Sequence, residues 1–216
     1  MPTPTFAQAP VQDRPGPYVI DARGVVASLP QDGSFFPPIP SATGVPRSGL
    51  GIDVGGHVYF LNLGPARLGV GASLLRASGD ASPATPASAS GAPRPPQTVP
   101  DVETRVRMFT PQLSFNFGSS SGWSYVSAGV GQISVRTTTS EFASGTSSTA
   151  PVTPARTRQS AALQTINFGG GARWFNTTHI AFTFDVRFHK ATGRSREGIS
   201  TAPVTLLTVS AGISLK

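Results

Sequence analysis

Residues 180–189 read Ile-Ala-Phe-Thr-Phe-Asp-Val-Arg-Phe-His, and this stretch decides the fold. Large apolar side chains occupy every second position from Ile180 to Phe188, and polar residues that include Asp185 and Arg187 alternate with most of them. Successive side chains of a β-strand point to opposite faces, so the alternation predicts a strand with one apolar face and one charged face.

Seven further segments alternate in the same way, although small residues leave the facing of segment 123–136 ambiguous. A proline at position 111 predicts a bulge or a register change within its strand. The seven segments are residues 17–29, 50–61, 66–77, 105–117, 123–136, 159–175 and 204–215.

The connections between these segments are short and long in turn. Short turns are expected at 62–65, 118–122 and 176–179, and long loops at 30–49, 78–101, 137–158 and 190–203. In an up-and-down barrel all long loops then lie at one end and all short turns at the other. The fold class predicted is all-β: an eight-stranded antiparallel up-and-down transmembrane β-barrel with four long external loops and three short periplasmic turns.

Composition excludes several other classes. Charged residues make up 12% of the chain, about half the usual share, and 24 glycines and 21 prolines do not suit a helical bundle. No stretch approaches the 18 or so consecutive apolar residues of a membrane-spanning helix. Cysteine is absent, which excludes a disulfide scaffold and thiolate metal sites.

The two faces of the strands distinguish a soluble barrel from a membrane barrel, because a soluble barrel buries its apolar face and a membrane barrel turns it toward lipid. Charged side chains near the middle of long strands favour the membrane barrel. Since eight strands enclose only enough space for side chains, we expect these charges to pair in a plugged lumen. A gated ion or proton path is the alternative. The predicted ion-pair network consists of Asp21, Arg23, Asp53, His57, Arg173, Asp185 and Arg187.

Aromatic residues gather near the short turns, as in the interfacial girdle of a membrane barrel. The predicted girdle consists of Phe60, Phe117, Trp123, Tyr125, Trp174 and Phe175.

In texture the chain resembles the family of small eight-stranded outer-membrane barrels, such as the OmpA transmembrane domain, OmpX and OmpW. The segments that carry the resemblance are Gly129-Val-Gly131, 182–188 and 210–215. Members of this family usually end on an aromatic residue that the barrel-insertion machinery reads, whereas this chain ends Leu215-Lys216. The resemblance implies a porin-like cell-surface protein of the outer membrane, assembled by that machinery, and no specific activity.

The formal net charge of +7 results mostly from arginines in or beside the long loops. Because arginine binds phosphate in a bidentate manner, we expect a basic rim that faces lipopolysaccharide; a merely solvated rim is the alternative. Nucleic acid is not an expected partner, since no stacking aromatics interleave with these arginines. The predicted rim consists of Arg76, Arg105, Arg107, Arg136, Arg158, Lys190, Arg194 and Arg196.

Residues 1–16 contain Ala7-Gln8-Ala9, which has the form of a signal-peptidase site, and are interpreted as an export-signal remnant or disordered tail before a barrel domain at 17–216. The expected function is non-enzymatic: a structural or surface-interaction role for a monomer in contact with outer-membrane lipid, with no cofactor and no metal. Two alternatives remain: a secreted soluble barrel that binds a small apolar ligand, and a lipid A-modifying enzyme. The enzyme would use His189, although Ala191 stands where the deacylase pattern has serine.

Overall fold

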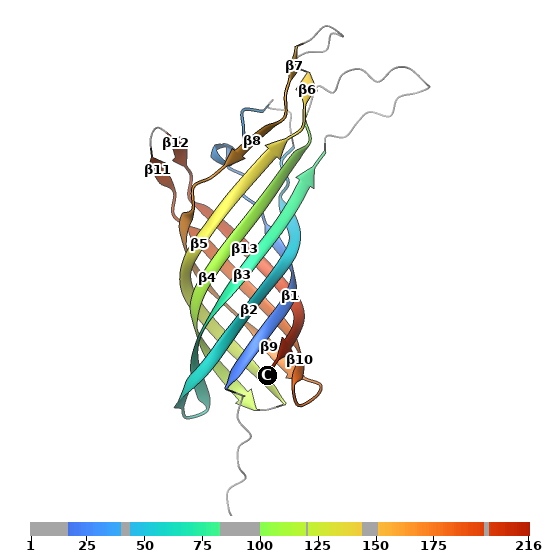
Figure 1. Ribbon diagram of the computed structural model, residues 1–216. Coiled ribbons are helices and arrows are strands. Elements are labelled where there is room, and N and C mark those ends of the chain that lie inside the picture. Colours follow the sequence, from blue (N-terminus) through green and yellow to red (C-terminus); the bar gives the residue numbers. More distant parts are fainter. Residues whose placement is uncertain (1–16, 40–43, 83–99, 120, 144–150, 197–198) are drawn as a thin grey trace, which may run out of the picture.

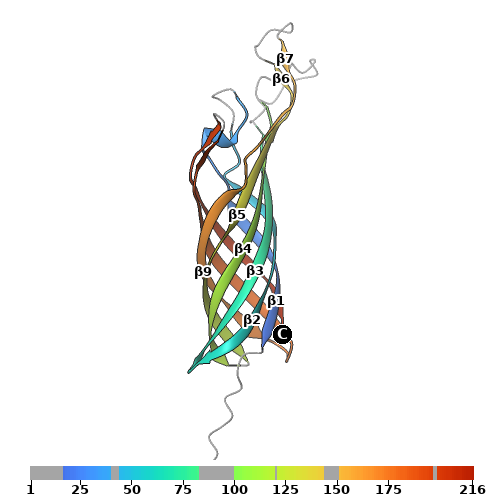
Figure 2. The same ribbon diagram turned by 60° about the vertical axis from the view of Figure 1, so that its left-hand side comes forward.

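Eight long antiparallel strands of 11 to 18 residues close into a single barrel. The computed structural model describes residues 17–39, 44–82, 100–119, 121–143, 151–196 and 199–216. Each long strand pairs with its neighbours in sequence, and the first strand also pairs with the last, which closes the wall (Figures 1 and 2). The predicted eight-stranded antiparallel up-and-down barrel is confirmed. The eight strands are β1 (Tyr18–Ser28), β2 (Ser48–Leu63), β3 (Ala66–Ala81), β4 (Val102–Ser119), β5 (Gly122–Thr139), β9 (Leu163–Phe175), β10 (Ile180–Ala191) and β13 (Val204–Leu215).

The long connections carry short elements at one end of the barrel, opposite the C-terminus (Figure 1). β8 follows the loop after β5 and extends the sheet by pairing with the end of β5. The predicted strand 159–175 is therefore wrong at its start, because β8 ends at Gln159 and β9 begins at Leu163. The short elements are the 3₁₀ turn η1 (Gly33–Phe35), β6 (Phe142–Ala143), β7 (Val152–Thr153), β8 (Arg156–Gln159), β11 (Arg194–Arg196) and β12 (Ile199–Thr201).

The opposite end of the barrel carries the short turns. β2 continues to Leu63 and β3 begins at Ala66, so the turn is two residues long and shorter than predicted. Gly64 has φ +61°, the backbone region that a tight hairpin of this length requires at its first central position. The turn between β9 and β10 spans 176–179, as predicted, and Asn176 donates its N–H to the Ile180 carbonyl.

Pro111 lies on β4 without a register change, so that prediction was wrong. The pairing of β4 with β5 skips Thr110 and Pro111 and resumes in the same register, because proline has no N–H to donate to the ladder. Among the described strands, a register shift lies in β2, between Tyr59 and Leu61.

Below the long-loop end, the outer wall of the barrel is apolar. On β10, for example, Phe182 is 66% exposed, whereas its neighbour Thr183 is 3% exposed and points inward. The same alternation runs along all eight long strands. A contiguous apolar surface of this extent is stable in lipid and not in water, which excludes the soluble ligand-binding barrel. Within the described part of the chain, no helix is long and apolar enough to span a bilayer.

The barrel interior has three layers. At the short-turn end Val19, Tyr59 and Trp123 form a small apolar cluster, and charged and polar side chains fill the middle. At the long-loop end the interior is apolar again, in a cluster that the alternation did not predict. The largest members of this upper cluster are Leu29, Phe35, Phe36, Leu75, Met108, Ile133, Leu163 and Leu206.

Candidate functional site

The charged middle layer of the lumen begins with Asp21 of β1 and Arg173 of β9. Arg173 donates from Nε to Asp21 Oδ1 (3.0 Å) and from Nη2 to Asp21 Oδ2 (2.7 Å). Ser214 of β13 donates a third hydrogen bond to the same carboxylate. Arg173 and Asp21 are completely buried, so this bidentate geometry is what offsets the cost of removing two charges from water.

A second group lies further toward the long-loop end and joins β1, β2 and β10. Arg23 binds Asp53 at 2.6 Å and lies 3.8 Å from Asp185, which in turn binds Arg187 at 3.0 Å. Arg187 also donates to Gln112, Asn167 and Ser127 from three other strands. The structure thus brings six of the seven predicted lumen residues into two ion-paired groups, with three aspartates balancing three arginines.

Tyr125 of β5 joins the two groups. Its hydroxyl accepts from Arg23 Nη1 (3.0 Å) and donates to Asp185 Oδ2 (2.8 Å), while the Arg173 guanidinium lies 4.1 Å from the centroid of its ring. The prediction that Tyr125 belongs to an interfacial girdle is therefore wrong. Its position next to a short turn suggested the membrane surface, but its parity along β5 directs the ring into the lumen.

Glycines on the inner face make room for the rings of the lumen. A Cβ added at Gly171 would lie 2.7 Å from the Tyr125 hydroxyl oxygen, and one at Gly71 would lie 2.3 Å from a ring carbon of His57. Added atoms at both positions would also overlap neighbouring backbone. Glycine at these two positions of the wall is therefore a packing requirement of the lumen.

The two histidines of the lumen are buried, and neither lies in a group of potential metal ligands among the described residues. His57 stacks on Tyr59 with a centroid separation of 6.2 Å and makes no ion pair with the aspartates. His189 lies 3.4 Å from the Thr208 hydroxyl, inside the barrel. No group of three or more potential metal ligands occurs among the described residues. His189 faces the lumen and not the lipid-facing wall.

A lid segment of the loop between β1 and β2 closes the apolar upper layer. Phe35 and Phe36 are 2% and 4% exposed within the upper cluster, and η1 lies at the long-loop end in Figure 2. Asp32 begins the turn by accepting from the Ser34 N–H (2.8 Å), and hydrogen bonds from Ser34 hold the pKa of the Asp32 carboxyl below its usual value. Ser34 Oγ in turn accepts from the Ala202 N–H, which fastens the lid to the last long loop.

The predicted girdle is divided between two surfaces. Phe60, Phe117 and Trp174 are exposed on the outer wall near the short turns. Trp123, by contrast, is 2% exposed inside the barrel, so its assignment to the girdle is wrong. Phe175 packs edge to face against Trp123 (5.1 Å between centroids) and is half-buried.

The predicted rim contains a group of cations on the outer wall. In the strand register, Arg76 of β3 lies opposite Arg107 of β4, and Arg105 of β4 lies opposite Arg136 of β5. These four side chains and Lys190 are exposed. Arg158 departs from the prediction, because it is half-buried and lines a hollow beside the lid residues Phe36 and Ile39. The side chains of Arg194 and Arg196, like residues 1–16, lie outside the described part of the structure.

Comparison with known proteins supports the fold. No protein-family model matches the sequence, and no curated protein matches it. The structure is similar to Neisserial surface protein A, with a TM-score of 0.54, 11% identity and coverage of 93% of this chain and 97% of that one. More distant similarity extends to Ail of Yersinia pestis (TM-score 0.41, 13% identity, 91% and 95% coverage) and to the N-terminal barrel domain of Pseudomonas aeruginosa OprF (TM-score 0.38, 10% identity, 92% and 96% coverage).

A closed eight-stranded barrel with an apolar outer wall and a polar lumen defines the class of transmembrane β-barrel proteins. The chain has the fold of the small outer-membrane barrels. Since barrels of this kind span the outer membranes of bacteria, the protein is an outer-membrane barrel protein.

Proposed function

We propose that the protein is a non-conducting, non-enzymatic barrel whose cationic rim contacts the phosphates of lipopolysaccharide at the cell surface. The proposal places the long-loop end outside and the short turns in the periplasm. A monomer inserted by the barrel-assembly machinery fulfils this role, because a single chain already closes the wall.

The observation that carries the proposal is that the outward faces of three strands change from apolar to cationic near the long-loop end. On each of these strands, the apolar side chain nearest the long loops lies two residues below a cation, below meaning toward the short turns. The pairs are Leu74 and Arg76, Phe109 and Arg107, and Phe188 and Lys190. A cation at this boundary between apolar and polar wall meets the headgroup region. Arginine in that region is suited to phosphate oxygens.

The layered lumen supports the non-conducting part of the proposal. Charged side chains in the middle layer are held by partners, and apolar clusters lie on both sides of them. An ion crossing this interior has to break a buried ion pair and pass two apolar layers, both of which oppose its entry. Ion passage requires the ion pairs to exchange partners.

Single-channel recording in planar bilayers tests the closed lumen. We expect no discrete conductance steps from the native protein or from a variant in which Phe35 and Phe36 are both alanine, because the charged layer still blocks the barrel beneath the lid. Reproducible steps that disappear in Arg187→Ala would contradict the plug and favour the gated ion path.

Binding to lipopolysaccharide tests the rim. The native chain in detergent is expected to retain lipopolysaccharide more strongly at low salt than at high salt, since exposed charges are screened by salt. Retention of lipopolysaccharide that depends neither on the salt concentration nor on the phosphate content of the lipopolysaccharide would contradict the proposed role of the rim. Lipid A of unchanged structure after overexpression is expected, and a modified lipid A would contradict the non-enzymatic role.

A further inference from the structure

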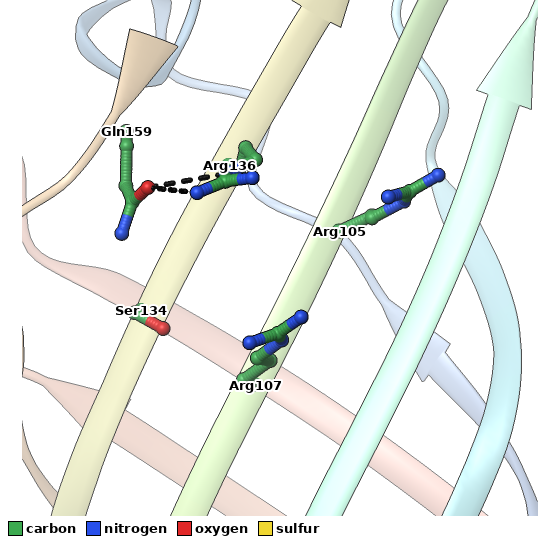
Figure 3. A pocket seen from close by; sticks show the side chains of 5 residues that line it. All are labelled: Arg105, Arg107, Ser134, Arg136 and Gln159. Carbon is green, nitrogen blue, oxygen red and sulfur yellow. Dashed lines mark hydrogen bonds between the residues drawn. The ribbon is translucent and has the colours of Figure 1, made fainter. Parts of the chain in front are cut away.

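A pocket on the outer wall gathers three of the rim arginines. Arg105 and Arg107 come from β4, Arg136 and Ser134 from β5, and Gln159 from β8 (Figure 3). The strand register sets Arg105 opposite Arg136 and Arg136 opposite Gln159, with Arg107 opposite Ser134 one step below. The arginine pocket therefore consists of two adjoining rows of donors on the outer wall.

The charges of this pocket are only partly neutralised. Glu103 binds Arg105 at 2.6 Å. Arg136 donates from Nε and Nη2 to the uncharged Gln159 Oε1, at 3.1 and 2.6 Å. Among the described residues, no carboxylate forms an ion pair with Arg107 or Arg136. Arg107 and Arg136 lie diagonally across β4 and β5, so an anion bound between them would neutralise two cations for which the described residues provide no carboxylate partner.

A largely apolar groove, whose lining also includes Gln132 and Gln164, lies below this pocket on the same wall. Phe109 lies two residues below Arg107 on the same face of β4, and the groove runs on along Pro111, Val130 and Ile166, with Lys190 beside it. It follows the place where the β4–β5 ladder is interrupted at Thr110 and Pro111. The groove faces the lipid because its apolar side chains belong to the outer wall, where Val130 is 65% exposed.

The geometry points to a specific site for one phosphorylated, multiply acylated lipid of the lipopolysaccharide type. Its phosphate binds in the arginine pocket, between Arg107 and Arg136, and one of its acyl chains lies in the groove along Val130. The cationic pocket above and the largely apolar groove below together select an amphipathic anion. Lys190 lines the groove and offers a cation in addition to the arginines of the pocket. This inference rests on the proposed function, because it requires the long-loop end to lie in the outer leaflet.

Two matched pairs of variants test the site in the full-length chain in detergent. The double variant Arg107→Gln/Arg136→Gln removes two charges from the pocket, and Arg47→Gln/Arg156→Gln removes two exposed charges elsewhere at the same end. Val130→Trp obstructs the groove, and Val54→Trp places the same side chain on the lipid-facing wall of β2. The shift in electrophoretic mobility on boiling shows that each variant is folded.

The probes are purified lipopolysaccharide, the same lipopolysaccharide after enzymatic dephosphorylation, and phosphatidylglycerol, each titrated by native mass spectrometry. We expect the pocket variant to bind phosphorylated lipopolysaccharide about tenfold more weakly, because charge-assisted hydrogen bonds are lost. The charge-matched control is expected to bind almost normally. The pocket variant and the native chain are expected to bind the dephosphorylated form equally. Val130→Trp is expected to weaken the binding of both the phosphorylated and the dephosphorylated lipopolysaccharide, and Val54→Trp is expected to weaken the binding of neither.

Equal weakening by the two double variants would overturn the specific site and leave the rim as a diffuse surface charge. Phosphatidylglycerol binding as tightly as lipopolysaccharide would overturn the assignment to a multiply acylated lipid. Failure of the native chain to bind lipopolysaccharide at any salt concentration would overturn both the site and the proposed function.

Discussion

The guanidinium of Arg173 lies 4.1 Å from the centroid of the Tyr125 ring while it binds Asp21 through two hydrogen bonds. The same tyrosine contacts Arg23 and Asp185 through its hydroxyl. One side chain thus links the two ion-paired groups of the lumen, by its face to the lower group and by its polar tip to the upper one. Buried charges on β1, β9 and β10 are thereby tied together through β5.

Tyr125→Phe tests this link because it keeps the ring over Arg173 and removes only the hydroxyl. We expect a loss of about 1–3 kcal/mol in the free energy of unfolding, since Arg23 and Asp185 each lose a buried partner. Urea unfolding of the protein in vesicles measures the change. Tyr18→Phe is the matched control, because Tyr18 is 49% exposed on the outer wall; a similar loss in both variants would contradict the link.

The pair formed by Asp21 and Arg173 supports a second prediction. Arg173→Met leaves a fully buried carboxylate without its cation, and a cost of about 3–5 kcal/mol is expected for such a change. Adding Asp21→Asn to the same chain removes the orphaned charge and is expected to restore part of the stability. A double variant less stable than Arg173→Met would show that the two residues do not act as a pair.

The two tryptophans provide a third prediction, since they lie on opposite sides of the wall. Trp174 is 57% exposed and Trp123 is 2% exposed. In vesicles that contain lipids brominated on their acyl chains, the fluorescence of Trp123→Phe, which reports Trp174, should be quenched strongly. The fluorescence of Trp174→Phe should be quenched much less. Equal quenching of the two variants would place Trp123 at the membrane surface after all.

The lid provides a fourth prediction. Phe35→Ala removes a buried ring from the upper cluster, but the eight strands keep their pairing, so we expect local opening rather than global unfolding. Amide hydrogen exchange should become faster in residues 29–39, and the denaturation midpoint should change little. A large fall in that midpoint would mean that the lid is part of the cooperative core of the barrel.

The alternation of apolar and polar residues was sufficient to predict the eight strands and the face of most of them. β10 was assigned correctly because large apolar side chains alternate with polar and charged ones from Phe182 to His189, and β1 because Asp21 and Arg23 mark its inner face. The inward and outward faces of β5 were harder to assign, because glycine and serine occupy much of this strand and small residues do not show which face is apolar. Trp123 and Tyr125 were placed by their distance from a turn, and the parity that puts both of them inside was not used.

Two features of the site could not be predicted from the sequence, for physical reasons. The upper layer of the lumen is apolar on its inner face as well as its outer face, as at Val25 and Val26, so the alternation disappears where the lid covers the barrel. The arginine pocket depends on the register between β4, β5 and β8, and register is set by pairing across strands that no single segment reveals.

The central claim is that the apolar face of every strand meets lipid, and β13 offers the most direct test because its inner face carries no charge. The chain contains no cysteine, so single cysteines at Leu207, Val209, Ala211 and Ile213 can carry nitroxide labels in vesicles. We expect these labels to collide frequently with oxygen and rarely with a water-soluble nickel complex, while cysteines at Thr208 and Ser210 react slowly because they are buried. Frequent collisions with nickel at the four outward positions would contradict the membrane barrel.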